Sequence, residues 1–146
     1  MLDKFTDDQK RTFLDLGQSY LLFRYHSRIS DGQFLYMGDP PPGHELVDQL
    51  SDEELKWLVD LALLETEASN AGSNGDHERS IELFKKVLDL APWNSIAIMS
   101  LGVQYAFLGQ GKKAIAFLER ASHMDLDNQQ IKKNLRAIQE DFGRGY

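Results

Sequence analysis

"SLGVQYAFLGQGKKAI", residues 100–115, holds one residue that is out of place in an otherwise good helix. Gly102 lies between Leu101 and Tyr105, and glycine inside a helix costs about 1 kcal/mol relative to alanine. A packing gain must therefore offset this cost. The same spacing of leucine, glycine and tyrosine occurs once more, in "DLGQSY" at residues 15–20.

The composition is that of an ordinary soluble protein, with 42% apolar and 27% charged residues in a chain of 146. The absence of cysteine excludes disulfides and thiolate chemistry. The first ten residues, "MLDKFTDDQK", lack the apolar core of a secretory signal. No apolar stretch approaches the roughly 20 residues that a membrane span requires. We therefore expect a cytoplasmic protein without membrane insertion.

The net charge of −7 is unevenly distributed along the chain. Residues 39–79 contain eleven acidic and two basic residues, a local charge of −9, and the remainder carries +2. A nucleic-acid-binding protein normally shows a basic stripe, so we expect no nucleic-acid partner. The acidic block is either a solvated helix face with polar loops or a surface that meets a basic partner.

Nearly every periodic segment predicts a helix, and no alternating segment is long enough to indicate a strand. Capping boxes at Thr6–Gln9 and Ser51–Glu54 open two of the helices, Asp76 caps a third, and Asp127 is expected to cap the last. The glycines and prolines of residues 27–43 predict a loop, and "SNAGSNG" at residues 69–75 is expected to end the second helix. The expected helices span about 7–25, 52–68, 77–90, 95–108, 112–124 and 128–141.

The sequence repeats itself with a period of about 34 residues, the spacing between Asn94 and Asn128. We call this spacing the repeat period. A shift by one repeat period also places Leu101 on Leu135, and it superposes an apolar helix face of the first copy on that of the second. The superposed pairs are Ile81 on Ile115, Leu83 on Phe117, Phe84 on Leu118, Val87 on Ala121 and Leu90 on Met124. Helix pairs that recur with a period of about 34 residues predict stacked helical hairpins.

Residues 95–128 resemble a tetratricopeptide repeat. The family pattern falls here on Ile98, Leu101, Gly102, Tyr105, Ala114, Leu118 and Leu126. The resemblance implies an all-α solenoid of hairpins, with an irregular N-terminal helix and a C-terminal capping helix. We expect one domain, 1–146, made of an N-terminal helix and proline-rich loop (1–50), a degenerate repeat (51–94), the best repeat (95–128), and the capping helix and tail (129–146).

Within this scheme the repeat explains Gly102, which is expected to face Ala114 and Ala121 where two helices approach closely. We extend the same explanation to Gly17. The degenerate repeat is expected to hold Leu61, Leu64 and Ala68, about three extra residues within 69–75, and Glu65 in place of the glycine.

The sequence offers no catalytic or metal-binding constellation. His26, His44, His77 and His123 show no metal-ligand spacing and are expected to be ordinary surface or helix-end residues. "DLDNQQ" at residues 125–130 lacks the glycine of a calcium loop, and "GQGKK" at residues 109–113 lacks the phosphate-loop pattern. We therefore predict a protein that is not an enzyme and has no cofactor and no metal.

The family resemblance implies a concave groove lined by the first helix of each hairpin. Its predicted positions here are all apolar: Ile96, Met99, Val103, Ala106 and Phe107. Family members that clamp a chaperone's terminal carboxylate carry basic residues there, so that activity is disfavoured. Either a partner's peptide fills the groove, or the apolar face of helix 7–25 covers it, because an apolar strip of this size marks an interaction site or is covered.

We therefore predict a protein–protein interaction module, an adaptor or chaperone that holds an apolar peptide or helix. Residues 101–125 are also similar in style to class II type III secretion chaperones. The alternative is a structural subunit that docks in a larger assembly or forms a homodimer, with its own N-terminal helix in the groove.

Overall fold

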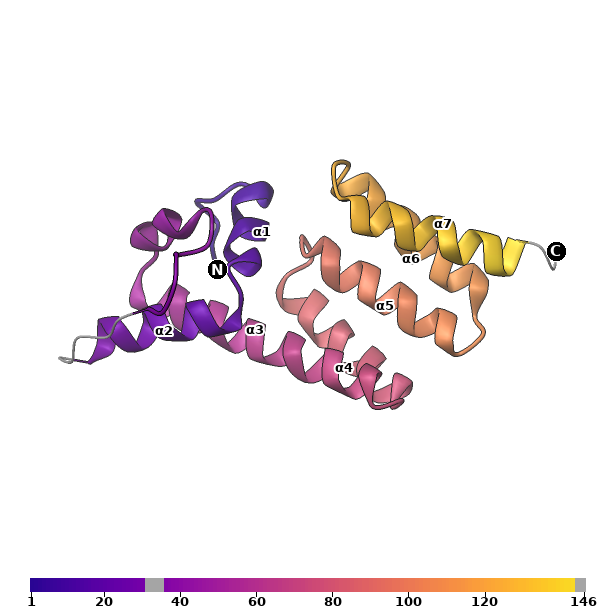
Figure 1. The fold of residues 1–146 in the computed structure, drawn as a ribbon, viewed down its shortest axis with the longest axis horizontal. Coiled ribbons are helices and arrows are strands. Elements are labelled where there is room, and N and C mark those ends of the chain that lie inside the picture. The colour runs from indigo at the N-terminus through magenta and orange to yellow at the C-terminus, as the bar shows by residue number, and fades with distance from the viewer. Residues whose placement is uncertain (31–35, 144–146) are drawn as a thin grey trace. The chain divides into compact units, whose positions relative to one another are not determined.

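All regular structure in residues 1–30 and 36–143, which the computed structural model describes, is helical (Figure 1). This confirms the predicted all-α fold. The α-helices are α1 (Asp7–Asp15), α2 (Gln18–Ile29), α3 (Asp52–Ser73), α4 (His77–Leu90), α5 (Ser95–Phe107), α6 (Gly111–Met124) and α7 (Gln129–Gly143), and a 3-10 helix, η1, spans His44–Gln49.

The chain packs as two units, Met1–Leu64 and Glu65–Tyr146, and α3 contributes residues to both. The single domain expected from the sequence stays a prediction.

In the first unit the N-terminal element is two helices, and the prediction of one helix over 7–25 is wrong. The break lies at Gly17, whose φ of 89° is a conformation that other residues rarely adopt. A Cβ atom added at Gly17 would meet no atom within 4 Å. Gly17 therefore serves a turn in the backbone and makes no close helix contact, which corrects the explanation carried over from Gly102.

Two arginines of α2 connect this helix to η1 and to the residue that follows η1. Arg24 donates a hydrogen bond to the hydroxyl of Tyr20 at 2.9 Å and pairs with Asp48. Arg28 donates to the carbonyl oxygen of Leu50 at 2.6 Å. The bond from Arg28 satisfies the backbone carbonyl at the C-terminal end of η1, where a helical partner is missing.

Both predicted capping boxes are present. The hydroxyl of Thr6 accepts from the amide of Gln9 at 3.2 Å, and Gln9 returns the bond to the amide of Thr6 at 2.9 Å. Ser51 and Glu54 make the same exchange at the start of α3. The hydrogen bond from the Ser51 amide is the main cause that holds the pKa of Glu54 below its ordinary value.

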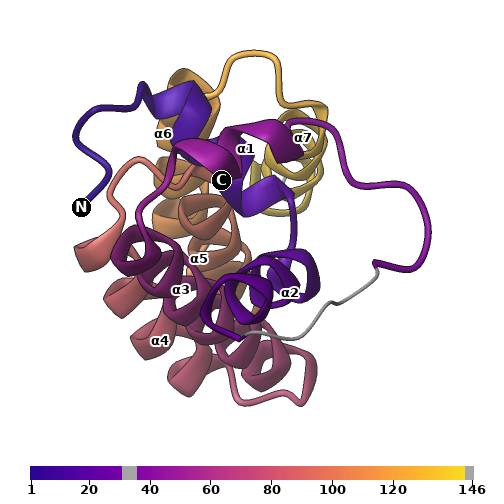
Figure 2. The same ribbon diagram turned by 90° about the vertical axis from the view of Figure 1, so that its left-hand side faces the viewer.

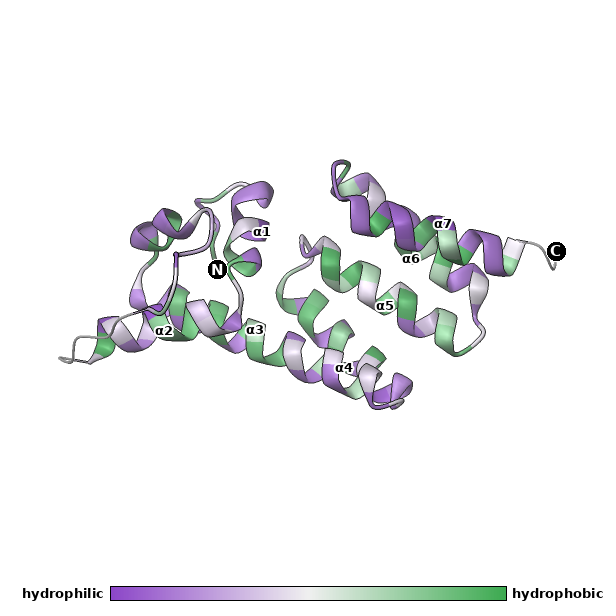
Figure 3. Ribbon diagram, viewed as in Figure 1, coloured by the Kyte–Doolittle hydropathy of each residue, from purple (hydrophilic) through white to green (hydrophobic). Residues whose placement is uncertain are grey.

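The second unit consists of consecutive antiparallel helices, which Figure 2 views nearly end on. Neighbours in the chain pack against each other from α4 to α7, and α7 also contacts α5. The core includes Ala68, Ile81, Phe84, Val87, Ile98, Leu101, Ala114, Leu118, Ala121 and Ile131. Figure 3 shows that α5 is hydrophobic over most of its length, whereas α7 is largely hydrophilic with single apolar positions. A central helix in contact with α4, α6 and α7 has to be apolar on several sides.

The turn inside each hairpin recurs after one repeat period. Gly75 and Gly109 have φ of 86° and 77°, and the residues that follow them close the same bond. The amide of Asp76 donates to the carbonyl of Ala71 at 2.9 Å, and the amide of Gln110 to the carbonyl of Tyr105 at 2.9 Å. Glycine is required at both positions because the backbone is left-handed there.

The turn between hairpins recurs in the same way. Asn94 accepts from the amide of Ala97 and Asn128 from that of Ile131, each at 3.1 Å. The predicted cap of the last helix, Asp127, is therefore wrong by one residue. Asparagine side chains suit this position because they satisfy an amide that the helix leaves unpaired.

The repeat consequently has no insertion, which corrects the expected extra residues within 69–75. Helix α3 continues through Ser73, and Ala68, not Glu65, lies one repeat period before Gly102. The hydroxyl of Ser80 donates to the carbonyl of Ala68 at 2.8 Å. A small residue thus stands at this helix contact in both hairpins.

Gly102 makes the close contact that its sequence context predicts. A Cβ atom there would lie 3.0 Å from the carbonyl oxygen of Ala114 and 3.1 Å from Cγ of Leu118. Phe117, at 3.2 Å, completes the three nearest neighbours, so Leu118 and Phe117 stand where Ala121 was expected. The packing gain of this approach offsets the poor helix propensity of glycine.

Candidate functional site

Two adjoining cavities flank α5 within the second unit, and together they are called the α5 groove below. The first has a volume of about 560 Å³ and is lined by Ser69, Gly72, Ser73, Gly75, His77, Phe84, Met99, Ser100, Val103, Gln104, Phe107 and Asn134. The second, of about 310 Å³, is lined by Val103, Ala106, Phe107, Asn134, Ala137, Ile138, Asp141 and Phe142. Val103, Phe107 and Asn134 line both cavities, so the groove is continuous across them.

The structure brings four of the five predicted groove residues together. Met99, Val103 and Phe107 line the first cavity, and Ala106 lines the second with Val103 and Phe107. Ile96 is half-buried and lines neither cavity. Positions 99, 103 and 107 are four residues apart, a spacing that places their side chains on one face of a helix.

Phe107 is the most exposed of these side chains. Its exposure is 65%, whereas Met99, on the floor of the groove, is only 9% exposed. A large aromatic side chain in this position is suited to a partner, because its burial would remove a substantial apolar area from water.

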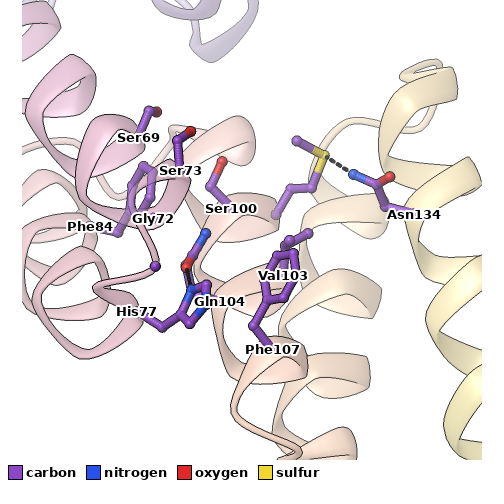
Figure 4. Close-up of a pocket in the computed structure, with 12 residues that line it drawn as sticks. Ser69, Gly72, Ser73, His77, Phe84, Ser100, Val103, Gln104, Phe107 and Asn134 are labelled. Carbon is purple, nitrogen blue, oxygen red and sulfur yellow. Dashed lines mark hydrogen bonds between the residues drawn. The ribbon is translucent and has the colours of Figure 1, made fainter.

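A histidine and a glutamine hold one side of Phe107 in place (Figure 4). The ring of His77 stacks on that of Phe107, with centroids 4.7 Å apart and planes 7° from parallel. The Nδ1 atom of His77 lies 2.6 Å from Oε1 of Gln104. This hydrogen bond links the ring of His77 to α5.

Gly72 makes room for the glutamine. A Cβ atom at Gly72 would lie 2.6 Å from Nε2 of Gln104, a side chain that is only 8% exposed. The glycine in α3, the glutamine in α5 and the histidine at the start of α4 therefore form one packed group. This group sets the orientation of the Phe107 ring.

Asn134 of α7 is fixed at the centre of the groove. Its amide nitrogen donates to the sulfur of Met99 at 3.2 Å, as Figure 4 shows, and its oxygen accepts from Gln130 at 3.0 Å. Asn134 thus contributes an oriented amide beside the apolar residues. An amide can bond a partner's backbone in either direction.

The groove is almost uncharged. Its lining residues include one carboxylate, that of Asp141, and no lysine or arginine. Such a surface has no cation with which to pair a peptide's terminal carboxylate. The arrangement can bury apolar side chains and can form a few neutral hydrogen bonds.

The sequence did not identify His77, Gln104 or Asn134 as groove residues. His77 was expected to be an ordinary helix-end histidine. The insertion-free repeat is the signal that would have helped, because it aligns His77 with Gly111, and Gly111 packs against Phe142 of the next helix. Position 77 thereby corresponds to a contact between neighbouring hairpins.

The described part of the chain, residues 1–30 and 36–143, contains no group of three or more side chains suited to hold a metal ion. Within the same residues, no helix has both the length and the apolar character to cross a membrane.

Comparison with known proteins agrees with this architecture. The tetratricopeptide repeat family model matches residues 73–138, which include both capping asparagines, Asn94 and Asn128. No curated protein matches the chain, and no solved structure does. Residues 73–138 of the chain are therefore a tetratricopeptide repeat region.

Proposed function

We propose that the α5 groove holds an apolar peptide or helix of a partner protein, and that the chain acts as an adaptor or chaperone. Tetratricopeptide repeats generally mediate protein–protein interactions and are typically non-catalytic. The observation that carries the finer proposal is Phe107, which is 65% exposed yet held by His77 on one side. An aromatic ring fixed before binding loses little entropy when a partner covers it.

The lining favours an amphipathic helix with apolar residues on one face. Met99, Val103, Ala106, Ile138 and Phe142 provide apolar surface on both sides of Phe107. A helix laid into such a groove buries side chains three and four residues apart. The amide of Asn134, which lines both cavities, is placed to bond a polar group of that helix. A segment of a secreted protein is one candidate, given the similarity in style to secretion chaperones.

The test compares substitutions at two residues whose side chains are almost equally exposed. Phe107 is 65% exposed inside the groove, and Leu126 is 64% exposed and lines neither of its cavities. Phe107→Glu should abolish co-purification of the partner from the cell of origin, because a carboxylate would be buried against apolar groups. Leu126→Glu should leave it unchanged.

The melting temperature of both variants completes the experiment. We expect both to remain close to the wild-type value, because surface substitutions usually change stability by no more than about 0.5 kcal/mol. Equal recovery of the partner with both variants would contradict the proposal. A marked loss of stability in Phe107→Glu alone would instead support a groove filled by the chain's own N-terminal helix.

A further inference from the structure

A second cavity of mixed character lies on another face of α5, and we call it the Tyr105 site. Its volume is about 390 Å³, and its lining comes from α4, α5 and α6: Lys85, Tyr105, Lys113, Ala116, Phe117 and Arg120. Tyr105 is two residues from both Val103 and Phe107, which is about 200° around a helix. The Tyr105 site is therefore separate from the α5 groove and shares no lining residue with it.

The floor of the Tyr105 site is aromatic. The rings of Tyr105 and Phe117 stack with centroids 5.4 Å apart and planes 2° from parallel. Tyr105 is only 7% exposed, so its ring is held within the helix packing.

The rim of the site is cationic. The Nζ atoms of Lys113 and Lys85 lie 5.2 and 6.0 Å from the centroid of the Tyr105 ring, and Arg120 completes the rim. No acidic residue lines the cavity. In the residues that the structure describes, none of the three basic side chains forms an ion pair. Three such cations around one cavity stand out in a chain with a net charge of −7.

The equivalent positions of the preceding hairpin lack these properties. The residue one repeat period before Tyr105 is Ala71, so the aromatic floor is missing. Arg79 corresponds to Lys113 but pairs with Glu67 at 2.8 Å. Glu82 corresponds to Ala116 and adds a carboxylate. The cationic aromatic site is therefore specific to the second hairpin and does not follow from the repeat fold alone.

We propose that the Tyr105 site binds an acidic segment of a protein partner. An apolar side chain of that segment lies on the rings of Tyr105 and Phe117, and carboxylates on either side pair with Lys85, Lys113 and Arg120. Charge complementarity selects the acidic partner, since opposite potentials steer association and fix the orientation of a bound segment. The apolar floor is needed as well, because exposed ion pairs by themselves contribute little free energy.

The probe is a fluorescent peptide with the sequence Gly-Asp-Glu-Phe-Asp-Glu-Gly, and binding is measured by fluorescence anisotropy with the full chain. One comparison peptide replaces the acids by Asn and Gln, and another replaces Phe by Gly. We expect the acidic Phe peptide to bind and both comparison peptides to bind about tenfold more weakly or not at all. Binding should weaken when salt is raised to about 0.5 M, since salt screens exposed charges.

The matched variants are K85E/K113E and K86E/K112E. All four lysines are exposed, the two variants change the net charge equally, and Lys86 and Lys112 do not line the site. We expect the K85E/K113E variant to lose binding by about tenfold or more, and the K86E/K112E variant to bind nearly as the wild type does. Phe107→Glu, in the α5 groove, should leave peptide binding unchanged, so this proposal can fail without the proposed function failing.

Equal loss in both double variants would overturn the proposal, because the effect would then follow from net charge alone. Equal binding of the peptide with Phe and the peptide with Gly would also overturn it. Self-association of the chain that K85E/K113E abolishes, without any peptide binding, would show that the occupant is a second copy and not an acidic partner.

Discussion

The two hairpins of the second unit share a backbone and differ in their surfaces. In both, a left-handed glycine closes the inner turn and an asparagine caps the following helix. The first hairpin has Ala68 at the helix contact, and its Arg79 is paired with Glu67. The second has Gly102 at that contact, an apolar α5 and the cationic rim of the Tyr105 site on its other face. Backbone geometry therefore depends on a few small or capping residues, and the other positions are available for binding.

The largest expected effect concerns the helix contact of the second hairpin. Gly102→Leu should lower the free energy of unfolding by about 1–3 kcal/mol, because the side chain would overpack against Ala114 and Leu118. Urea denaturation monitored by circular dichroism measures this change. Gly143→Leu is the control, since a Cβ atom at Gly143 would meet no atom within 4 Å. A Gly102→Leu variant as stable as Gly143→Leu would refute the explanation of Gly102.

The two capping asparagines allow a direct comparison between hairpins. Asn94→Ala and Asn128→Ala should each cost about 0.5–2 kcal/mol. Each asparagine also donates to a carboxylate, Asn94 to Glu65 at 3.3 Å and Asn128 to Asp125 at 3.2 Å. The cost should be greater for Asn94, because it is only 2% exposed and Asn128 is half-buried. Serine in place of either asparagine should restore most of the loss. Denaturation midpoints in the reverse order would show that burial of the cap does not set its cost.

Much of the second unit could be predicted from its sequence, since the apolar periodicity and the repeat period locate α4 to α7 within about two residues. The contact of Gly102 was predicted for the same reason. The first unit was less predictable, because a glycine such as Gly17 can serve either a close contact or a left-handed turn, and spacing alone does not distinguish them.

The wrong predictions for residues around the α5 groove have a related cause. The glycine and serines of residues 69–75 favour a loop, but packing of Gly72 against Gln104 keeps that segment helical as far as Ser73. Tertiary contacts here override local propensity. The roles of His77 and Asn134 depend on which hairpins are neighbours in space, and a single apolar pattern does not report this.

The smallest expected effect is the difference in stability between variants of Arg79, which forms an ion pair, and of Lys113, its counterpart in the Tyr105 site. Arg79→Ala should cost about 0.2–1 kcal/mol, since its ion pair with Glu67 is exposed to solvent. Lys113→Ala should cost less than Arg79→Ala, because it breaks no ion pair within the described residues. Thermal unfolding of the two variants, compared at low and high salt, checks this order. A greater loss for Lys113→Ala would mean that Lys113 has a structural role and is not reserved for a ligand.

The most direct test of the binding groove is photo-cross-linking from position 107. A photoreactive phenylalanine analogue at this position, with position 126 as the control, would be irradiated in the cell of origin and the products mapped by mass spectrometry. We expect position 107 to form an adduct with a different protein. Position 126 should form no adduct of the same mass. Cross-links from position 107 to residues 1–30 of the same chain would contradict the proposed groove, because they would show that the protein fills it by itself.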